Sequence, residues 1–95
     1  METEQPGYLD DKDDLTRRLR RIAGQVNGVE RMVEDERYCI DILTQISAIR
    51  SALDRVALAV LDDHARHCVV AAAEGERDER TAEMMDAVAR LLKGR

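Results

Sequence analysis

The chain has 95 residues, of which 44% are hydrophobic and 37% charged, and its formal net charge is −5. A chain this short buries only a modest fraction of its surface on folding, so we expect a partner subunit to help stabilise it. The acidic total argues weakly against nucleic-acid binding as a bulk property, although a local basic patch can exist on an acidic protein.

The N-terminal residues 1–11 are acidic and contain Pro6-Gly7. They are predicted to form a disordered tail before one helical domain at residues 12–95. They lack the basic and apolar regions of a signal peptide, and no stretch approaches the roughly 18 apolar residues of a membrane span. We therefore expect a cytoplasmic protein, in which Cys39 and Cys68 favour metal binding or thiol chemistry over a structural disulfide.

A first helix is predicted to begin near Asp13 or Asp14 and to continue to about Val33. Its apolar residues recur in steps of four and three and form one stripe: Leu15, Leu19, Ile22, Val26, Val29 and Val33. Four arginines within five residues lie off this stripe: Arg17, Arg18, Arg20 and Arg21. A short turn is expected around residues 34–37, where the stripe ends.

The second predicted helix runs from about Glu36 to Ala73 and would be roughly 55 Å long. Its apolar residues follow a heptad pattern: Ile42, Ile46, Ile49, Leu53, Val56 and Val60. Such a seam is typical of a helix that packs against a partner helix. Gly75 and residues 76–80 are then expected to form a loop, and residues 81–92 a third, short amphipathic helix that stops near Gly94.

Three metal-ligating residue types continue the seam of the second helix. Cys39 precedes Ile42 by three residues, His64 follows Val60 by four, and Cys68 follows His64 by four. Cys39 and His64 are 25 residues apart, or roughly 37 Å along a straight helix, against metal–ligand bonds of about 2.0–2.3 Å. An antiparallel pair of second helices brings Cys39 of one subunit opposite His64 and Cys68 of the other, and symmetry then gives two identical sites per dimer.

The same residues have plainer interpretations. A lone cysteine is more often part of a core than a ligand, and a single histidine at a helix end is more often an ordinary surface residue. Two thiolates and one imidazole favour Cu(I) in a trigonal site. Spacing alone leaves zinc open, because His67 could complete a four-ligand set. Nickel or cobalt would more naturally gather several histidines, and the chain has two.

Three segments resemble the copper-sensing operon repressor (CsoR/RcnR) family: residues 20–28, residues 37–48 and residues 64–69. The resemblance covers roughly residues 12–93. It implies an all-α, three-helix subunit with one long central helix, an antiparallel dimer and a dimer-of-dimers tetramer that binds operator DNA. It also implies one Cu(I) per subunit, held by Cys39, His64 and Cys68.

The resemblance assigns further roles. Tyr38 and Glu83 match positions that link the ligand histidine to the third helix, and the Glu83 match requires a one-residue gap. The implied DNA contacts are Arg18, Arg21, Arg50 and Arg55. Ala23 and Asn27 depart from the pattern, since many members carry Glu and Arg there. Without the resemblance, the arginines fit equally well a solvated face paired with acidic residues.

The predicted function is therefore a Cu(I)-responsive repressor that holds operator DNA in the apo form and releases it when Cu(I) binds. One alternative is a persulfide- or thiol-responsive repressor that uses Cys39 and Cys68. Another is a copper-buffering helical protein without DNA binding. An enzyme is disfavoured, because the sequence offers neither an oxyanion-hole loop beside the cysteine and histidine nor a Gly-rich phosphate cradle. No membrane and no small-molecule substrate are expected as partners.

Overall fold

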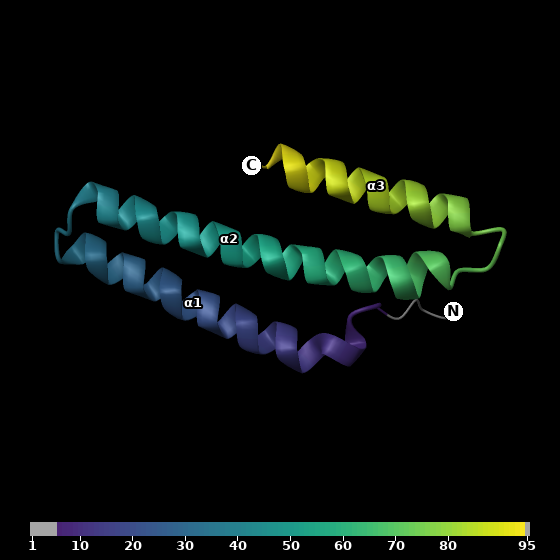
Figure 1. Cartoon of the computed structure of the whole chain (residues 1–95), viewed down its shortest axis with the longest axis horizontal. Coiled ribbons are helices and arrows are strands. Elements are labelled where there is room, and N and C mark those ends of the chain that lie inside the picture. The colour runs from purple at the N-terminus through teal and green to yellow at the C-terminus, as the bar shows by residue number, and fades with distance from the viewer. Residues whose placement is uncertain (1–5, 95) are drawn as a thin grey trace. The chain divides into compact units, whose positions relative to one another are not determined.

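The computed structural model describes residues 6–94. The elements in chain order are a 3-10 turn η1 (Leu9–Asp11), helix α1 (Lys12–Glu34), helix α2 (Cys39–His64), a π-helical segment η2 (Ala65–Val70) and helix α3 (Arg77–Lys93) (Figure 1). All regular structure within the described residues is helical, which confirms the predicted all-α subunit with a long central helix. None of the described helices has the length and apolar character needed to cross a membrane.

The chain falls into two compact units. One unit is Asp10–Ala59, which holds α1 and most of α2, and the other joins Met1–Leu9 to Val60–Arg95. Helix α1 begins at Lys12, and the division into a tail at residues 1–11 and one domain at residues 12–95 stays a prediction. The tail predicted at residues 1–11 lies partly outside the described residues, which begin at Pro6.

The turn after α1 explains why the second helix begins later than predicted. The backbone N–H of Arg37 donates to the carbonyl of Met32 at 2.9 Å, and that of Glu36 donates to Val33 at 3.1 Å. This pair of bonds is the Schellman motif, which satisfies the last carbonyls of a helix. It requires a left-handed residue, and Glu36 has a φ of 58°. The left-handed Glu36 therefore prevents α1 from continuing beyond Glu34, and α2 begins at Cys39.

The core of the Asp10–Ala59 unit lies between α1 and α2. It consists of one residue per heptad from each helix: Leu15 and Ile22 from α1, Ile49 and Val56 from α2. Val29, Ala52 and Ala59 pack against these four side chains. This core is small, because it uses only every second residue of each predicted apolar stripe.

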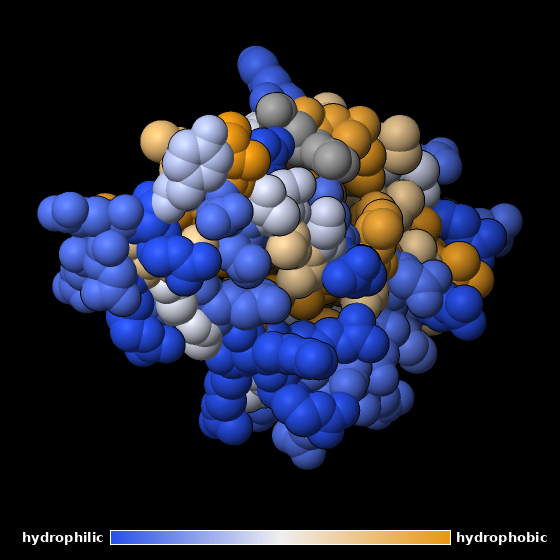
Figure 2. Space-filling model, turned by 60° about the vertical axis from the view of Figure 1, so that its left-hand side comes forward, coloured by the Kyte–Doolittle hydropathy of each residue, from blue (hydrophilic) through white to orange (hydrophobic). Residues whose placement is uncertain are grey.

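The other half of each stripe is exposed in the single chain. Leu19, Val26 and Val33 of α1 are 46%, 50% and 59% exposed. On α2, Ile46 and Leu53 are 38% and 45% exposed. Hydrophobic surface is correspondingly visible among charged side chains in Figure 2. Exposed apolar side chains in such numbers mark an interaction surface on a small protein.

The Val60–Arg95 unit continues from the end of α2. The predicted helix to Ala73 is α-helical only to His64, and its last turn is the π-helical η2. Val69 of this segment is buried, and α3 packs against η2. The N-terminal chain also passes closely here, since a Cβ on Gly7 would lie 2.7 Å from the carbonyl oxygen of Asp63.

Helix α3 begins four residues earlier than predicted, at Arg77 instead of Thr81. The charged run that looked like a loop is its first turn. Asp78 and Glu79 lie in that turn, where carboxylates interact favourably with the helix dipole. The loop after Gly75 is correspondingly shorter, and Gly94 follows the last residue of α3 as predicted.

Candidate metal and DNA-binding residues

The first predicted metal ligand, Cys39, lies at the very start of α2. Its side chain is exposed, and it forms no disulfide. Tyr38 precedes it and is 69% exposed. The carbonyl of Tyr38 accepts the backbone N–H of Ile42 at 3.3 Å, which fixes the start of the helix. The thiol is therefore held on a regular element and is accessible from outside the subunit.

The other two predicted ligands lie one turn apart at the C-terminal end of the same helix and just beyond it. His64 is the last residue of α2, and Cys68 lies in the π-helical segment that follows. Both side chains are half-buried, whereas His67 between them is exposed. Arg66, on the outer side, forms an ion pair with Asp62 at 3.1 Å. The local fold thus separates a partly covered pair, His64 and Cys68, from a solvent-facing His67.

A single subunit does not assemble the predicted ligand set. Within the described residues, no group of three or more His, Cys, Asp or Glu side chains could hold a metal ion. Cys39 and His64 are the first and last residues of the 26-residue helix α2. That length corresponds to about 39 Å of helix, so a site using both residues needs a second chain.

The donor types nevertheless fit a soft metal ion. Two thiols and one imidazole match the preference of Cu(I) for sulfur and nitrogen ligands. Cys39 is exposed and His64 half-buried at the two ends of α2, and the seam residue Leu53 in the middle of this helix is exposed. The residues present are therefore compatible with copper bound between two subunits, with thiolates from both of them.

Glu83 and Tyr38, the residues predicted to support the ligand histidine, lie in different units. Glu83 is on α3, and its carboxylate lies 3.5 Å from the guanidinium of Arg80. Its side chain is 62% exposed, while that of Arg80 is 23% exposed. The roles of Tyr38 and Glu83 in supporting a metal site stay predictions.

Three of the four arginines predicted to contact DNA line one hollow in the Asp10–Ala59 unit. Arg18 and Arg21 come from α1 and Arg55 from α2, around a volume of about 490 Å³. The apolar part of its lining consists of Ile22, Ala52 and Val56. Arg50 is exposed on α2 but does not line this hollow. The arrangement concentrates positive charge on one face of an acidic protein.

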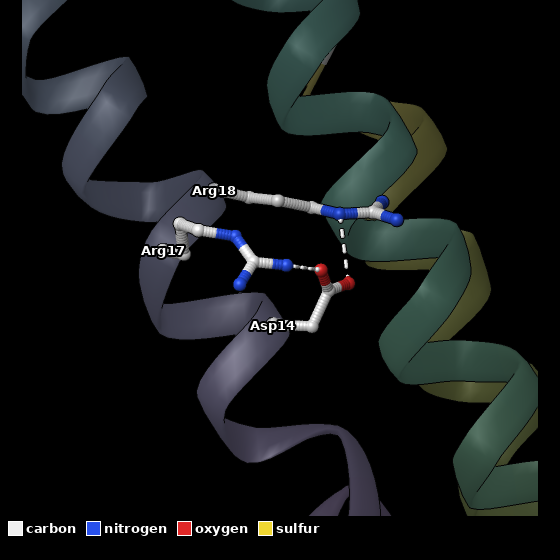
Figure 3. Close-up of polar contacts among 3 residues, drawn as sticks. All are labelled: Asp14, Arg17 and Arg18. Carbon is white, nitrogen blue, oxygen red and sulfur yellow. Dashed lines mark hydrogen bonds and ion pairs between the residues drawn. The ribbon is translucent and has the colours of Figure 1, made fainter.

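Two polar residues near this hollow were missed by the sequence analysis. Gln25 lines the hollow one helical turn after Arg21. Asp14 forms ion pairs with Arg17 and Arg18, as Figure 3 shows. The spacing of Asp14 from these arginines, three and four residues on a helix, is the signal that predicts such pairs.

Comparison with known proteins gives the class of this chain. Residues 11–90 match the family of metal-sensitive transcriptional repressors. The chain belongs to this family. This confirms the resemblance noted in the sequence, and the family is one of repressors and not of enzymes.

Particular relatives share most of their length with this chain. It is 53% identical over 90 residues to the copper-sensing transcriptional repressor RicR of Mycobacterium tuberculosis, covering 92% of this chain and 94% of RicR. It is 48% identical over 84 residues to the copper-sensing transcriptional repressor CsoR of Bacillus subtilis, covering 87% and 83%.

Two solved structures share the fold. The Cu(I)-bound copper-sensing repressor CsoR of Geobacillus thermodenitrificans superposes with a TM-score of 0.83 at 44% identity, covering 97% of this chain and 94% of that one. The nickel-responsive regulator InrS superposes with a TM-score of 0.72 at 46% identity, covering 82% and 89%. Identity over the whole chain therefore does not distinguish copper from nickel, and the ligand residues must decide the metal.

Proposed function

We propose that this protein is a cytoplasmic transcriptional repressor that responds to Cu(I). In the apo form it binds operator DNA, and Cu(I) binding releases it. Two findings together support this proposal: two thiols and one imidazole that suit Cu(I), and membership of the family of metal-sensitive repressors. Cys39, His64 and Cys68 lie on or beside one long helix in a chain that is 53% identical to a copper-sensing repressor.

The proposed metal site lies between two subunits that pack with their α2 helices antiparallel. Cys39 of one subunit then joins His64 and Cys68 of the other, giving one Cu(I) per subunit. The uncovered half of the seam, including the 45% exposed Leu53 in the middle of α2, supports such a pairing. Two dimers are proposed to form a tetramer, which places several arginine-lined hollows on one assembly.

The proposed DNA surface is the arginine face of the Asp10–Ala59 unit. Arg18, Arg21 and Arg55 around one hollow supply the charge that backbone phosphates require, and exposed Arg50 extends this charge along α2. The chain has two Tyr and neither Phe nor Trp, so stacking on bases contributes little. Contacts to the backbone of duplex DNA are therefore expected to dominate.

Copper must bind the DNA-free conformation more tightly than the DNA-bound one for the switch to work. Thermodynamic linkage then requires DNA to weaken copper binding by the same factor. Because the ligand cysteines must lose their protons, copper uptake is also expected to release protons and to weaken in acid.

The direct test is an anaerobic titration of Cu(I) into protein bound to a labelled duplex from the DNA upstream of its own gene. Fluorescence anisotropy is expected to fall as one Cu(I) per subunit is added. His64→Ala should lose this response while keeping DNA binding. His67→Ala is the matched control, since it removes an imidazole three residues away, and it should respond like the unaltered protein.

Other outcomes would identify the alternatives. If Cu(I) saturates the protein and the anisotropy does not change, the proposed switch is wrong. Release by polysulfide together with a mass increase on Cys39 or Cys68 would indicate a thiol sensor. A protein that binds copper but never binds the duplex would be a copper buffer. Release by Ni²⁺ and not by Cu(I) would indicate a regulator of the nickel type.

A further inference from the structure

Asp14 forms ion pairs with two arginines of α1, one of which, Arg18, belongs to the proposed DNA-binding face. One of its carboxylate oxygens pairs with the guanidinium of Arg17 at 2.5 Å, and the other pairs with Nε of Arg18 at 3.0 Å. Both partners lie on the same helix as Asp14, so the arrangement is local to α1 (Figure 3). Each oxygen of the Asp14 carboxylate therefore has an arginine partner at the edge of the proposed DNA surface.

Arg18 connects this ion pair to the hollow described above. Its side chain lines the hollow together with Arg21 and Arg55, and it is 48% exposed. The Asp14 carboxylate is 40% exposed and so stands in solvent at the same face. A phosphate that approaches Arg18 thus meets a guanidinium that already has an anionic partner.

We propose that Asp14 competes with DNA phosphate for Arg18 and so lowers the affinity of the repressor for DNA. This inference rests on the proposed function, because it assumes that the arginine face binds DNA. When DNA binds, Arg18 must either leave Asp14 or hold a phosphate with a second anion nearby, and both options weaken the complex.

The salt dependence of binding gives this competition a measurable form. Each phosphate neutralised by a cationic side chain releases condensed counterions, and the slope of log affinity against log salt changes by about −0.9 per contact on duplex DNA. An arginine already neutralised by Asp14 contributes less to this slope. Removing the carboxylate should therefore make the slope steeper by up to about one unit.

The size of the effect follows from screening. At physiological ionic strength, charges interact over a Debye length of about 8 Å, so Asp14 acts on phosphates at Arg18 and little beyond. Removing the negative charge of Asp14 also frees Arg18 to bind phosphate. We expect the protein then to bind DNA about three- to tenfold more tightly at low salt. The gain should be similar for operator and scrambled duplexes, because phosphate contacts carry no direct sequence information.

The experiment compares Asp14→Asn with Asp13→Asn in the full-length protein. Asp13 and Asp14 both lie in the first turn of α1, so the two variants change net charge and the helix-dipole interaction equally. Within residues 6–94, Asp13 forms no ion pair. Affinities for the upstream duplex and a scrambled duplex of equal length are measured by anisotropy from roughly 50 to 200 mM salt, the range in which phosphate contacts dominate.

Asp14→Asn is expected to bind both duplexes three- to tenfold more tightly at low salt and to show the steeper salt slope. Asp13→Asn, which frees no arginine, should change affinity less than Asp14→Asn does and should leave the salt slope unchanged. Asp14→Glu, which keeps the charge, should stay close to the unaltered protein. Equal effects of Asp13→Asn and Asp14→Asn would overturn the inference, because bulk charge would then explain both. If the unaltered protein does not bind the upstream duplex at all, the proposed function is wrong, and the inference about Asp14 is wrong with it.

Discussion

Glu36 occupies the one backbone position in the described chain where a non-glycine residue has a positive φ, at 58°. The left-handed conformation costs an L-residue about 1–2 kcal/mol, and β-branched residues tolerate it least. We therefore expect Glu36→Gly to raise the free energy of unfolding and Glu36→Val to lower it, with about 1–2 kcal/mol between the two variants. Both variants lose the same charge. Urea denaturation measures the difference, and a more stable valine variant would contradict the Schellman turn.

Some residues of the candidate site can be predicted from the sequence, and others cannot. Cys39, His64 and Cys68 are predicted to be ligands from their spacing, because the heptad seam passes through or near all three positions, and this assignment stays a prediction. The pairing of Asp14 with Arg18 follows a simple helical rule but was not assigned. The left-handed Glu36 could not be predicted, because glutamate gives no local signal for that conformation.

The two long helices show how an apolar stripe is divided between neighbours. Ile49 of α2 is 8% exposed against α1, whereas Ile46, one turn earlier, is 38% exposed. Periodicity identifies the stripe but not which half of it faces the same chain, since both halves lie within one helical face. Helix bounds are harder to predict than the helices themselves. The long central helix is predicted from Glu36 to Ala73 and runs from Cys39 to His64, and the charged first turn of α3 hides its start.

The division of the stripe leads to a prediction about helix packing. Ile49→Ala removes a buried side chain from the core formed with Leu15, Ile22 and Val56. It should lower the free energy of unfolding by about 2–4 kcal/mol, because the cavity left behind is only partly filled. The same loss is expected at every protein concentration, since the contact lies within one chain. Denaturant titrations at two concentrations test this, and a cost below about 1 kcal/mol would contradict the assigned core.

At the scale of the whole molecule, the exposed half of the seam implies that the single chain is not the functional form. Its buried apolar core has four residues in the Asp10–Ala59 unit, which is little for a protein of this length. The oligomer was inferred from the sequence because Cys39 and His64 cannot meet within one helix. The arrangement of subunits could not be worked out from one chain, because it depends on surfaces that only a partner completes.

Leu53→Glu tests that assembly. Leu53 lies in the middle of α2 and is 45% exposed in the single chain. A carboxylate there would be buried without a partner in an antiparallel α2 pair, so the variant should dissociate into monomers and lose copper binding together with DNA binding. Leu58→Glu is the control, since Leu58 is 60% exposed and lies off the seam. Sedimentation velocity reads the outcome, and an intact oligomer of Leu53→Glu would rule out the proposed pairing.

The π-helical segment Ala65–Val70 has a consequence for how chain length varies in this family. A π turn spans one more residue per hydrogen bond than an α turn, so it can take up a surplus residue without ending the helix. The match of Glu83 to the family pattern needs a one-residue gap, and η2, which contains Cys68, lies between His64 and α3. We therefore expect homologues that are one residue shorter here to wind this stretch as ordinary α-helix and to keep their third helix aligned with the same face.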